Sequence, residues 1–296
     1  MKYELKKGRI SIDTGSEFEG KTVQEFLEYF RQSKKNRYLL ILNKNILINR
    51  EPVSNDQTVL QKNDIVTILL PALKTDFKPS ETPCRVVYED DFVYVAHKDA
   101  GIIIHDENDP DCLACRAAAW QTANGIDTPV RYIHRLDKET SGLVLFVKIP
   151  FFQPWYDAML EEKQIRRHYL AITLGSGEPG RKFTYNQKIG KDRHVSGKYR
   201  FSESGKEAVT RAEFLARKNR YMLIGCTLET GRTHQIRVHL SGNRHPIIND
   251  PLYGIPSADF RNMCLWADEI EFPNPVTHEV CTAKDTMNPD FRMFFR

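Results

Sequence analysis

A single carboxylate stands among charged and polar side chains near the middle of the chain. Asp137 lies within residues 132–142 (Y-I-H-R-L-D-K-E-T-S-G), and an apolar run at 143–147 follows. The apolar run predicts a buried strand, so Asp137 and the neighbouring Arg135 are expected at its edge. An ionised carboxylate in that position can act as a nucleophile or remove a proton. Read alone, an Asp before Thr-Ser-Gly favours a turn or capping residue.

Two further stretches contain residues that can do chemistry. Residues 228–240 (L-E-T-G-R-T-H-Q-I-R-V-H-L) bring two arginines, two histidines and a glutamine together. Such side chains bind phosphate groups, and a basic surface helix is the alternative interpretation. Residues 165–175 predict a strand that carries Tyr169. A tyrosine on a strand is most often a core aromatic whose hydroxyl has a partner.

In chain order, the three stretches resemble the motifs of the RluA-type RNA pseudouridine synthases. H-R-L-D-K-E-T-S-G matches H-R-L-D-x-x-T-S-G without a gap, which implies that Asp137 is the catalytic residue. R-H-Y-L-A-I-T-L-G resembles K-x-Y-x-A-x-x-x-G, whose active-site tyrosine is Tyr169 here. T-G-R-T-H-Q-I-R-V-H resembles T-G-R-x-H-Q-x-R-x-H, whose last Arg, here Arg237, pairs with the catalytic Asp. The resemblance covers about residues 84–290.

Three positions depart from the family pattern. Asp99 stands where V-x-x-K-P-x-G has Pro, and this exchange is expected to loosen a turn. Arg167 replaces the usual Lys and keeps its charge. Trp266 replaces the His of the L-H-A element and puts its local hydrogen bond in question. None of these exchanges removes a residue to which the resemblance gives a catalytic role.

The resemblance implies a mechanism without a cofactor. The bond between uracil nitrogen and ribose breaks, the uracil turns, and it rejoins through a ring carbon, with no redox change. The target uridine must leave its stack to reach Asp137, and the resemblance implies that Arg135 fills the vacated space. Arg237 favours the ionised form of Asp137. Whether Asp137 attacks the sugar or abstracts a sugar proton stays open, as does whether Tyr169 removes a ring proton or positions the base.

The N-terminal part predicts a small basic domain. Residues 31–50 contain six basic residues and no acidic one, and residues 20–30 predict a helix that begins with a capping box at Thr22 and Glu25. Residues 3–12 predict a strand. The order of elements resembles the alpha-L RNA-binding module of a ribosomal small-subunit protein, although Arg50 stands where Gly is usual. A solvated basic face is the alternative.

The resemblance implies an α+β protein, and the strand-rich pattern agrees with it. We expect an RNA-binding domain at residues 1–70, a Pro-rich linker at 71–83 and a catalytic domain at 84–296. The resemblance implies the pseudouridine synthase fold for the catalytic domain, with a mixed, largely antiparallel sheet and flanking helices. The residues expected to bind RNA are His134, Arg135, Arg232, His234 and Gln235 in the catalytic domain and Lys34, Lys35 and Arg37 in the small one.

Composition limits the class of protein. The chain of 296 residues is 41% hydrophobic and 28% charged, with a net charge of +4, as in ordinary globular proteins and compatible with an RNA partner. No apolar segment suggests a signal peptide or a membrane span, so we expect a cytoplasmic protein. We also expect a monomer. No nucleotide-binding motif is present, and Cys112 and Cys115 form a lone C-x-x-C that favours free thiols over a metal site.

The expected activity is isomerisation of uridine in structured RNA. Large-subunit ribosomal RNA is the favoured substrate, since an extension of this kind accompanies many ribosomal RNA members of the family, and transfer RNA is the alternative. A catalytically silent RNA-binding relative would not need Asp137, Tyr169 and Arg237. A glycosidase-like enzyme would need a second paired carboxylate, and only Glu139 accompanies Asp137.

Overall fold

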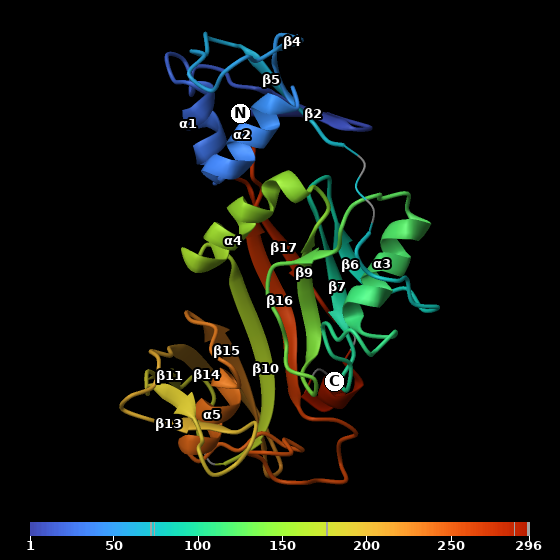
Figure 1. The fold of residues 1–296 in the computed structure, drawn as a ribbon. Helices are drawn as coiled ribbons and strands as arrows, with labels where there is room; N and C mark the ends of the chain where they lie inside the picture. Colours follow the sequence, from blue (N-terminus) through green and yellow to red (C-terminus); the bar gives the residue numbers. More distant parts are fainter. Residues whose placement is uncertain (72, 74, 176, 287, 295–296) are drawn as a thin grey trace.

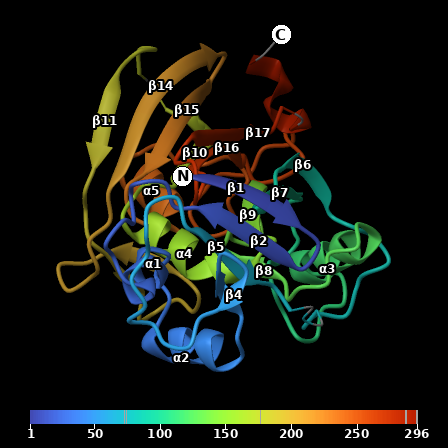
Figure 2. The same cartoon turned by 90° about the horizontal axis from the view of Figure 1, so that it is seen from above.

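The structure is a computed structural model that describes residues 1–71, 73, 75–175, 177–286 and 288–294. Its N-terminal part is a five-stranded antiparallel sheet in the order β1-β2-β5-β3-β4, with two helices beside it (Figures 1 and 2). Residues 3–12 form a hairpin, not the predicted single strand, because Gly8 turns the chain with a φ of +78°. The elements are β1 (Lys2–Lys6), β2 (Arg9–Asp13), α1 (Val23–Tyr29), α2 (Lys34–Leu42), β3 (Ile46–Ile48), β4 (Glu51–Pro52) and β5 (Ile65–Leu69).

Helix α1 confirms the predicted capping box. The Thr22 hydroxyl accepts from the Glu25 backbone N–H at 3.2 Å, and the Glu25 carboxylate accepts from the Thr22 N–H at 2.7 Å. Such a pair satisfies two backbone donors that a helix end would otherwise leave unbonded. The apolar face of α1, with Val23, Phe26 and Leu27, is buried against the small sheet.

The larger part of the chain forms a mixed ten-stranded sheet. Its main path is β11-β14-β15-β10-β16-β9-β7-β6, with β17 paired to β16 and β8 paired to β9. Helices flank it, as the sequence predicts for this α+β fold (Figure 1). The elements are β6 (Arg85–Glu89), β7 (Val93–Lys98), α3 (Leu113–Ala123), β8 (Arg131–Tyr132), β9 (Ser141–Val147), α4 (Gln153–Glu161), β10 (Arg166–Leu174), β11 (Lys182–Tyr185), β12 (Ile189–Lys191), β13 (Tyr199–Phe201), β14 (Thr210–Lys218), β15 (Tyr221–Leu228), α5 (Gln235–Gly242), β16 (Leu265–Pro273) and β17 (Val280–Lys284), with 3₁₀ turns at Pro150–Phe152 and Pro289–Phe294.

Strand β9 is the buried strand that the apolar run predicts, and it starts where the polar loop ends. All seven of its residues are buried. It runs antiparallel to β7 but parallel to β16, with Gly142 opposite Ala267. Because this parallel seam joins the two halves of the sheet, it fixes the loop that precedes β9 relative to β10 and α5 on the other side.

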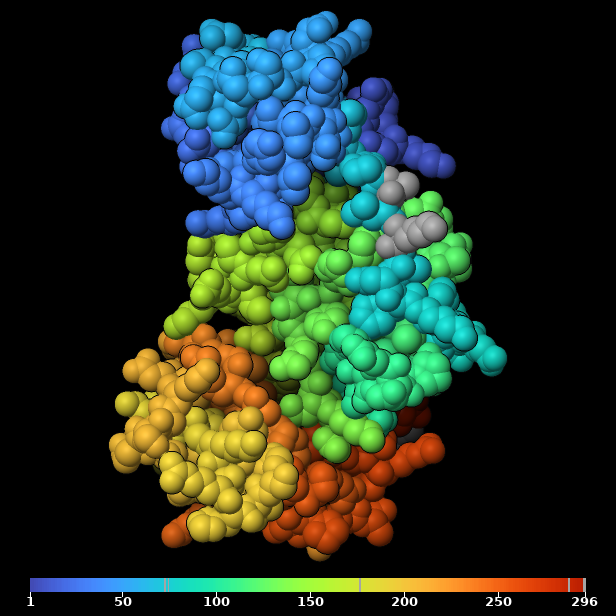
Figure 3. Space-filling view, in the orientation of Figure 1, coloured from blue at the N-terminus to red at the C-terminus, as the bar shows by residue number. Residues whose placement is uncertain are grey.

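The small N-terminal domain packs directly on the larger part of the chain. The Phe30 ring lies 5.4 Å from that of Phe152, and the Gln32 side chain donates to the Phe151 carbonyl at 2.6 Å. Figure 3 shows the small domain at one end of the molecule. The described part of residues 71–83 contains no helix or strand.

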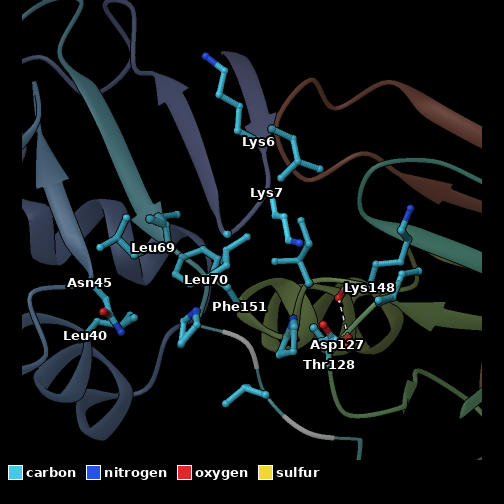
Figure 4. Close-up of a pocket in the computed structure, with 18 of the residues that line it drawn as sticks. Lys6, Lys7, Leu40, Asn45, Leu69, Leu70, Asp127, Thr128, Lys148 and Phe151 are labelled. Atoms are coloured by element: carbon cyan, nitrogen blue, oxygen red, sulfur yellow. Dashed lines mark hydrogen bonds between the residues drawn. The ribbon is translucent and has the colours of Figure 1, made fainter. Parts of the chain in front are cut away.

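A cavity of about 700 Å³ opens at this junction. Its apolar lining comes from α2, from the end of β5 and from residues 125–128 and 148–151, and lysines 6, 7 and 148 also line it (Figure 4). The lining includes none of the residues that the sequence predicts to do chemistry. The candidate active site therefore lies elsewhere.

The close contact between Gly142 and Ala267 predicts that one added methyl group at Gly142 strongly destabilises the fold. A Cβ on Gly142, whose φ is +118°, would lie 2.2 Å from the Ala267 carbonyl oxygen, so Gly142→Ala should lower the free energy of unfolding by about 3 kcal/mol. Gly125 also has a positive φ, of +67°, but its Cβ would meet nothing within 4 Å, so Gly125→Ala should cost only about 1 kcal/mol. Urea unfolding of both variants measures the difference, and equal losses would contradict the close contact at the seam.

Candidate active site

Asp137 lies on the loop between β8 and β9, and a buried lysine holds that loop. Lys98 is fully buried, and its Nζ donates to the carbonyls of Lys138 at 2.9 Å, Ile102 at 2.7 Å and Asp99 at 3.0 Å. The Lys138 carbonyl also accepts from the Gly101 N–H at 2.8 Å. Burial lowers the pKa of Lys98 to about 7, although nearby carboxylates, that of Asp137 foremost, oppose the shift. The loop is therefore fixed by backbone contacts on the residue next to Asp137.

Asp137 pairs with Arg237, as the sequence predicts. The Arg237 Nη1 donates to Asp137 Oδ2 at 2.9 Å, although the two residues lie on different sides of the β9–β16 seam. The Asp137 side chain keeps 25% of its surface exposed, whereas that of Arg237 keeps 1%. A buried cation thus faces a carboxylate that a ligand can still reach.

A second carboxylate holds the rest of the Arg237 guanidinium. Asp250, whose side chain is fully buried, accepts from Nε at 2.7 Å and from Nη2 at 2.8 Å. Burial opposes the charge on Arg237, but the hydrogen bonds and charges of Asp250 and Asp137 outweigh it and raise the arginine's pKa. This two-point contact sets the orientation of the guanidinium and leaves Nη1 for Asp137.

Two more titratable groups lie at the same place. The Glu139 Oε2 is 3.9 Å from Arg237 Nη1, and the His234 Nε2 is 3.8 Å from Asp137 Oδ2. His234 is the N-cap of α5 and has a left-handed backbone, with a φ of 56°. A backbone of this kind is strained for a residue with a side chain, so the surrounding contacts must hold it.

Tyr169 lies on β10 and is buried, with 4% of its surface exposed. Burial raises the pKa of its hydroxyl, and the Asp137 charge adds to the rise while Arg167 opposes it. The hydroxyl therefore keeps its proton near neutral pH.

Two residues expected to bind RNA are instead part of the interior. His134 has 6% exposure, and its Nε2 accepts from the Leu145 N–H at 3.3 Å. Burial, assisted by the Arg167 charge, lowers the pKa of His134 to about 3, so the ring is neutral. Gln235 is 3% exposed, and its amide bonds Thr230, Arg232, Val209 and Thr210. Both side chains are buried, and an RNA contact by either residue stays a prediction.

The other expected RNA contacts have exposed or partly exposed side chains. Arg135 and Arg232 are exposed, and the Arg232 Nε donates to the Glu207 carbonyl at 2.8 Å. Lys34 and Lys35 are exposed at the start of α2, while Arg37 is half-buried and pairs with Glu28 at 3.0 Å. Figure 1 separates α2 from α5 along the length of the molecule, so the two groups form separate surfaces.

The described residues hold no cluster of three or more His, Cys, Asp or Glu that fits a metal ion. All six cysteines are free thiols, and the Sγ atoms of Cys112 and Cys115 lie 3.5 Å apart. None of the helices described is long and apolar enough to cross a membrane.

Comparison with known proteins agrees with the geometry. Residues 92–242 match the model of the RNA pseudouridylate synthase family, and residues 10–66 match that of the RluD ribosomal pseudouridine synthase N-terminal domain. An uncharacterized RNA pseudouridine synthase of Bacillus subtilis, YhcT, is 34% identical over 85% of this chain and 84% of its own. The ribosomal large subunit pseudouridine synthase D of Xylella fastidiosa is 29% identical over 95% and 92%.

Solved structures support the fold. Human RNA pseudouridylate synthase domain containing 4 is 21% identical, with a TM-score of 0.59 over 70% of this chain and 90% of its own. The chain therefore belongs to the RNA pseudouridylate synthase family and is an RNA pseudouridine synthase, an isomerase. Its small domain is of the type found at the N-terminus of RluD synthases.

Sequence reasoning gave no role to two residues that shape this site. Asp250 lies in the apolar run P-I-I-N-D at 246–250, and an acidic residue that ends such a run is a weak signal for a buried ion pair. Lys98 is the last residue of β7 and resembles an ordinary strand end, so nothing local indicates that its ammonium is buried.

The Asp250 contact predicts a large loss of stability. Asp250→Ala leaves the buried Arg237 with Asp137 as its one hydrogen-bonded carboxylate, which should lower the free energy of unfolding by about 3 kcal/mol. Glu213→Ala removes an acid from an exposed pair with Lys182, 3.6 Å apart, and should cost less than about 1 kcal/mol. Denaturant unfolding compares the two variants, and a small loss at Asp250 would mean that Arg237 does not depend on it.

Proposed function

We propose that Asp137 is the catalytic residue of this pseudouridine synthase and that Arg237 keeps it ionised and oriented. The observation that carries the proposal is the 2.9 Å bond from the buried Arg237 to a carboxylate that is still accessible. A neighbouring cation favours the charged form, which either attack on the sugar or abstraction of a sugar proton requires.

Tyr169 completes the proposed site. Because burial keeps its hydroxyl protonated, we assign it the positioning of the uracil over the removal of the ring proton. Arg135, exposed two residues before Asp137, is proposed to enter the space that the flipped uridine leaves. Arg232 would meet the RNA backbone near Asp137. His234, whose Nε2 lies 3.8 Å from Asp137 Oδ2, would act on that carboxylate.

We propose large-subunit ribosomal RNA as the substrate. Relatives from Xylella fastidiosa and Xanthomonas campestris carry the name ribosomal large subunit pseudouridine synthase D, and the small domain matches the N-terminal domain of that type. Residues 1–70 would bind the RNA through Lys34, Lys35 and Arg37, residues 71–83 would link the domains, and residues 84–296 would carry the chemistry. A cytoplasmic monomer is the simplest form for this role, and transfer RNA is the alternative substrate.

Loss of the Asp137 charge should abolish turnover while RNA binding persists. Asp137→Asn keeps the size of the side chain but cannot act as a nucleophile or base, so its pseudouridine yield should fall by at least about 10⁴-fold. Pseudouridine mapping of total RNA from cells that lack the gene, complemented with wild type or with Asp137→Asn, measures it. Sites restored by wild type alone identify the substrate, and restoration by the variant would contradict the catalytic role.

The small domain predicts a change in salt dependence. Lys34→Gln with Lys35→Gln removes two exposed charges, so the slope of log affinity against log salt should fall by about 1.5 if each contacts a phosphate. Lys182→Gln with Lys284→Gln removes the same charge from exposed lysines that pair with Glu213 and Glu269, and should leave the slope unchanged. Equal slopes for both double variants would leave the basic stretch as a solvated face.

A further inference from the structure

Tyr253 contacts both of the groups that face Asp137. Its hydroxyl bonds the His234 Nδ1 at 2.9 Å, and its ring lies 5.2 Å from the Arg237 guanidinium carbon. The same hydroxyl accepts from the Tyr199 backbone N–H at 2.7 Å. The proposed mechanism gives Tyr253 no role, yet Tyr253 contacts both His234 and Arg237, the two groups that face the Asp137 carboxylate.

These contacts favour one position for the proton of His234. The Tyr253 oxygen already accepts from Tyr199, so its own O–H is free to donate to His234 Nδ1. An imidazole that accepts at Nδ1 carries its proton on Nε2, which faces Asp137 Oδ2 at 3.8 Å. The opposite tautomer would turn a lone pair of Nε2 toward a carboxylate, which is repulsive.

The surroundings keep the ring neutral. Burial lowers the pKa of His234; Asp137, Asp250 and Glu139 oppose the shift, whereas the Arg237 charge adds to it. A neutral imidazole carries a single N–H. The nitrogen that holds this proton therefore decides whether Asp137 faces a donor or a lone pair.

We infer that Tyr253 is a positioning residue of the synthase. It fixes His234 as the Nε2–H tautomer aimed at Asp137 and supports the Arg237 guanidinium on its ring. The inference deepens the proposed function, since it assumes that Asp137 is the reactive carboxylate. The chain of donors from Tyr199 through Tyr253 and His234 then runs in one direction, toward Asp137.

The chain also joins the site to the β12–β13 hairpin. Tyr199 begins β13, its ring packs on His234 with centroids 5.5 Å apart, and Lys198 lies 5.4 Å from the Tyr253 ring. Lys191, Arg193 and Arg200 of the same hairpin are exposed. The N–H that sets the Tyr253 hydroxyl therefore comes from a segment with an exposed basic surface.

The first test removes only the hydroxyl. Tyr253→Phe keeps the ring on Arg237 and should lower the single-turnover rate on substrate RNA by roughly tenfold, the equivalent of about 1.4 kcal/mol. RNA affinity should stay unchanged, because the hydroxyl acts through His234 and not on the RNA. The melting temperature should fall slightly, because the Tyr199 N–H loses its acceptor. Tyr185→Phe makes the same chemical change at a buried tyrosine of β11 outside this chain of donors and should keep the wild-type rate. A wild-type rate for Tyr253→Phe overturns the inference.

A double-mutant cycle separates positioning from a structural effect. His234→Gln offers an amide N–H in place of Nε2–H without tautomers, so the hydroxyl should matter much less in that background. Loss of the Tyr253 hydroxyl should then cost less than about twofold. The same tenfold loss in both backgrounds would mean that Tyr253 does not act through His234.

A measurement that does not depend on turnover tests this inference separately from the proposed function. Nitrogen NMR of histidine-labelled protein reports the tautomer of His234, which should be Nε2–H in wild type and mixed or reversed in Tyr253→Phe. An Nδ1–H tautomer in wild type overturns the inference whether or not the enzyme is active. The expected tautomer in a protein that modifies no RNA would leave the positioning intact and reject the function.

Discussion

The site depends on one buried guanidinium that two carboxylates share. Arg237 has lost nearly all its hydration, and such a charge persists in a protein interior only where hydrogen bonds replace the lost water. Asp250 supplies two of these bonds from a fully buried position, so the cation is in place before any ligand arrives. Asp137 can then remain accessible, because it does not have to balance the charge of Arg237 alone. Asp250 is thus structural, and Asp137 stays free for the role proposed for it.

The sheet brings these residues together from separate parts of the chain. The loop with Asp137 leads into β9, whereas Arg237 and Asp250 lie between β15 and β16. The parallel contact of β9 with β16 joins the two parts, and Gly142 lets the backbones approach at that contact. Lys98 fixes the loop from the opposite side through backbone carbonyls. The β9–β16 contact and the Lys98 contacts, which come from different parts of the sequence, together set the geometry of the site.

Local patterns predicted the elements well, and motifs predicted the pair at the centre. The capping box of α1 and the buried strand β9 were readable from residue types and spacing, whereas the bond between Asp137 and Arg237 was implied by the family resemblance. The directions in which the side chains point were not readable in this way. His134 and Gln235 stand inside polar motifs, but the fold turns them inward, where a backbone N–H bonds His134 Nε2 and neighbouring groups bond the Gln235 amide. A motif gives the identity of a residue, and the fold decides which side of the backbone it faces.

Two of the three departures from the family pattern, Asp99 and Trp266, meet in one network. Asp99 lies 3.3 Å from His97, and the Trp266 indole N–H donates to Asp285 at 3.2 Å. His97 itself bonds Asp285 at 2.5 Å. Although burial opposes the charge of Asp285, its contacts with His97 and Arg85 outweigh it and lower the pKa of that carboxyl. Trp266 therefore still supplies an N–H to a buried acid, and Asp99 gains a partner next to the Lys98 anchor. The exchanges preserve hydrogen bonding at the base of the catalytic loop, which explains how the chain can depart from the pattern there while its reactive residues keep their geometry.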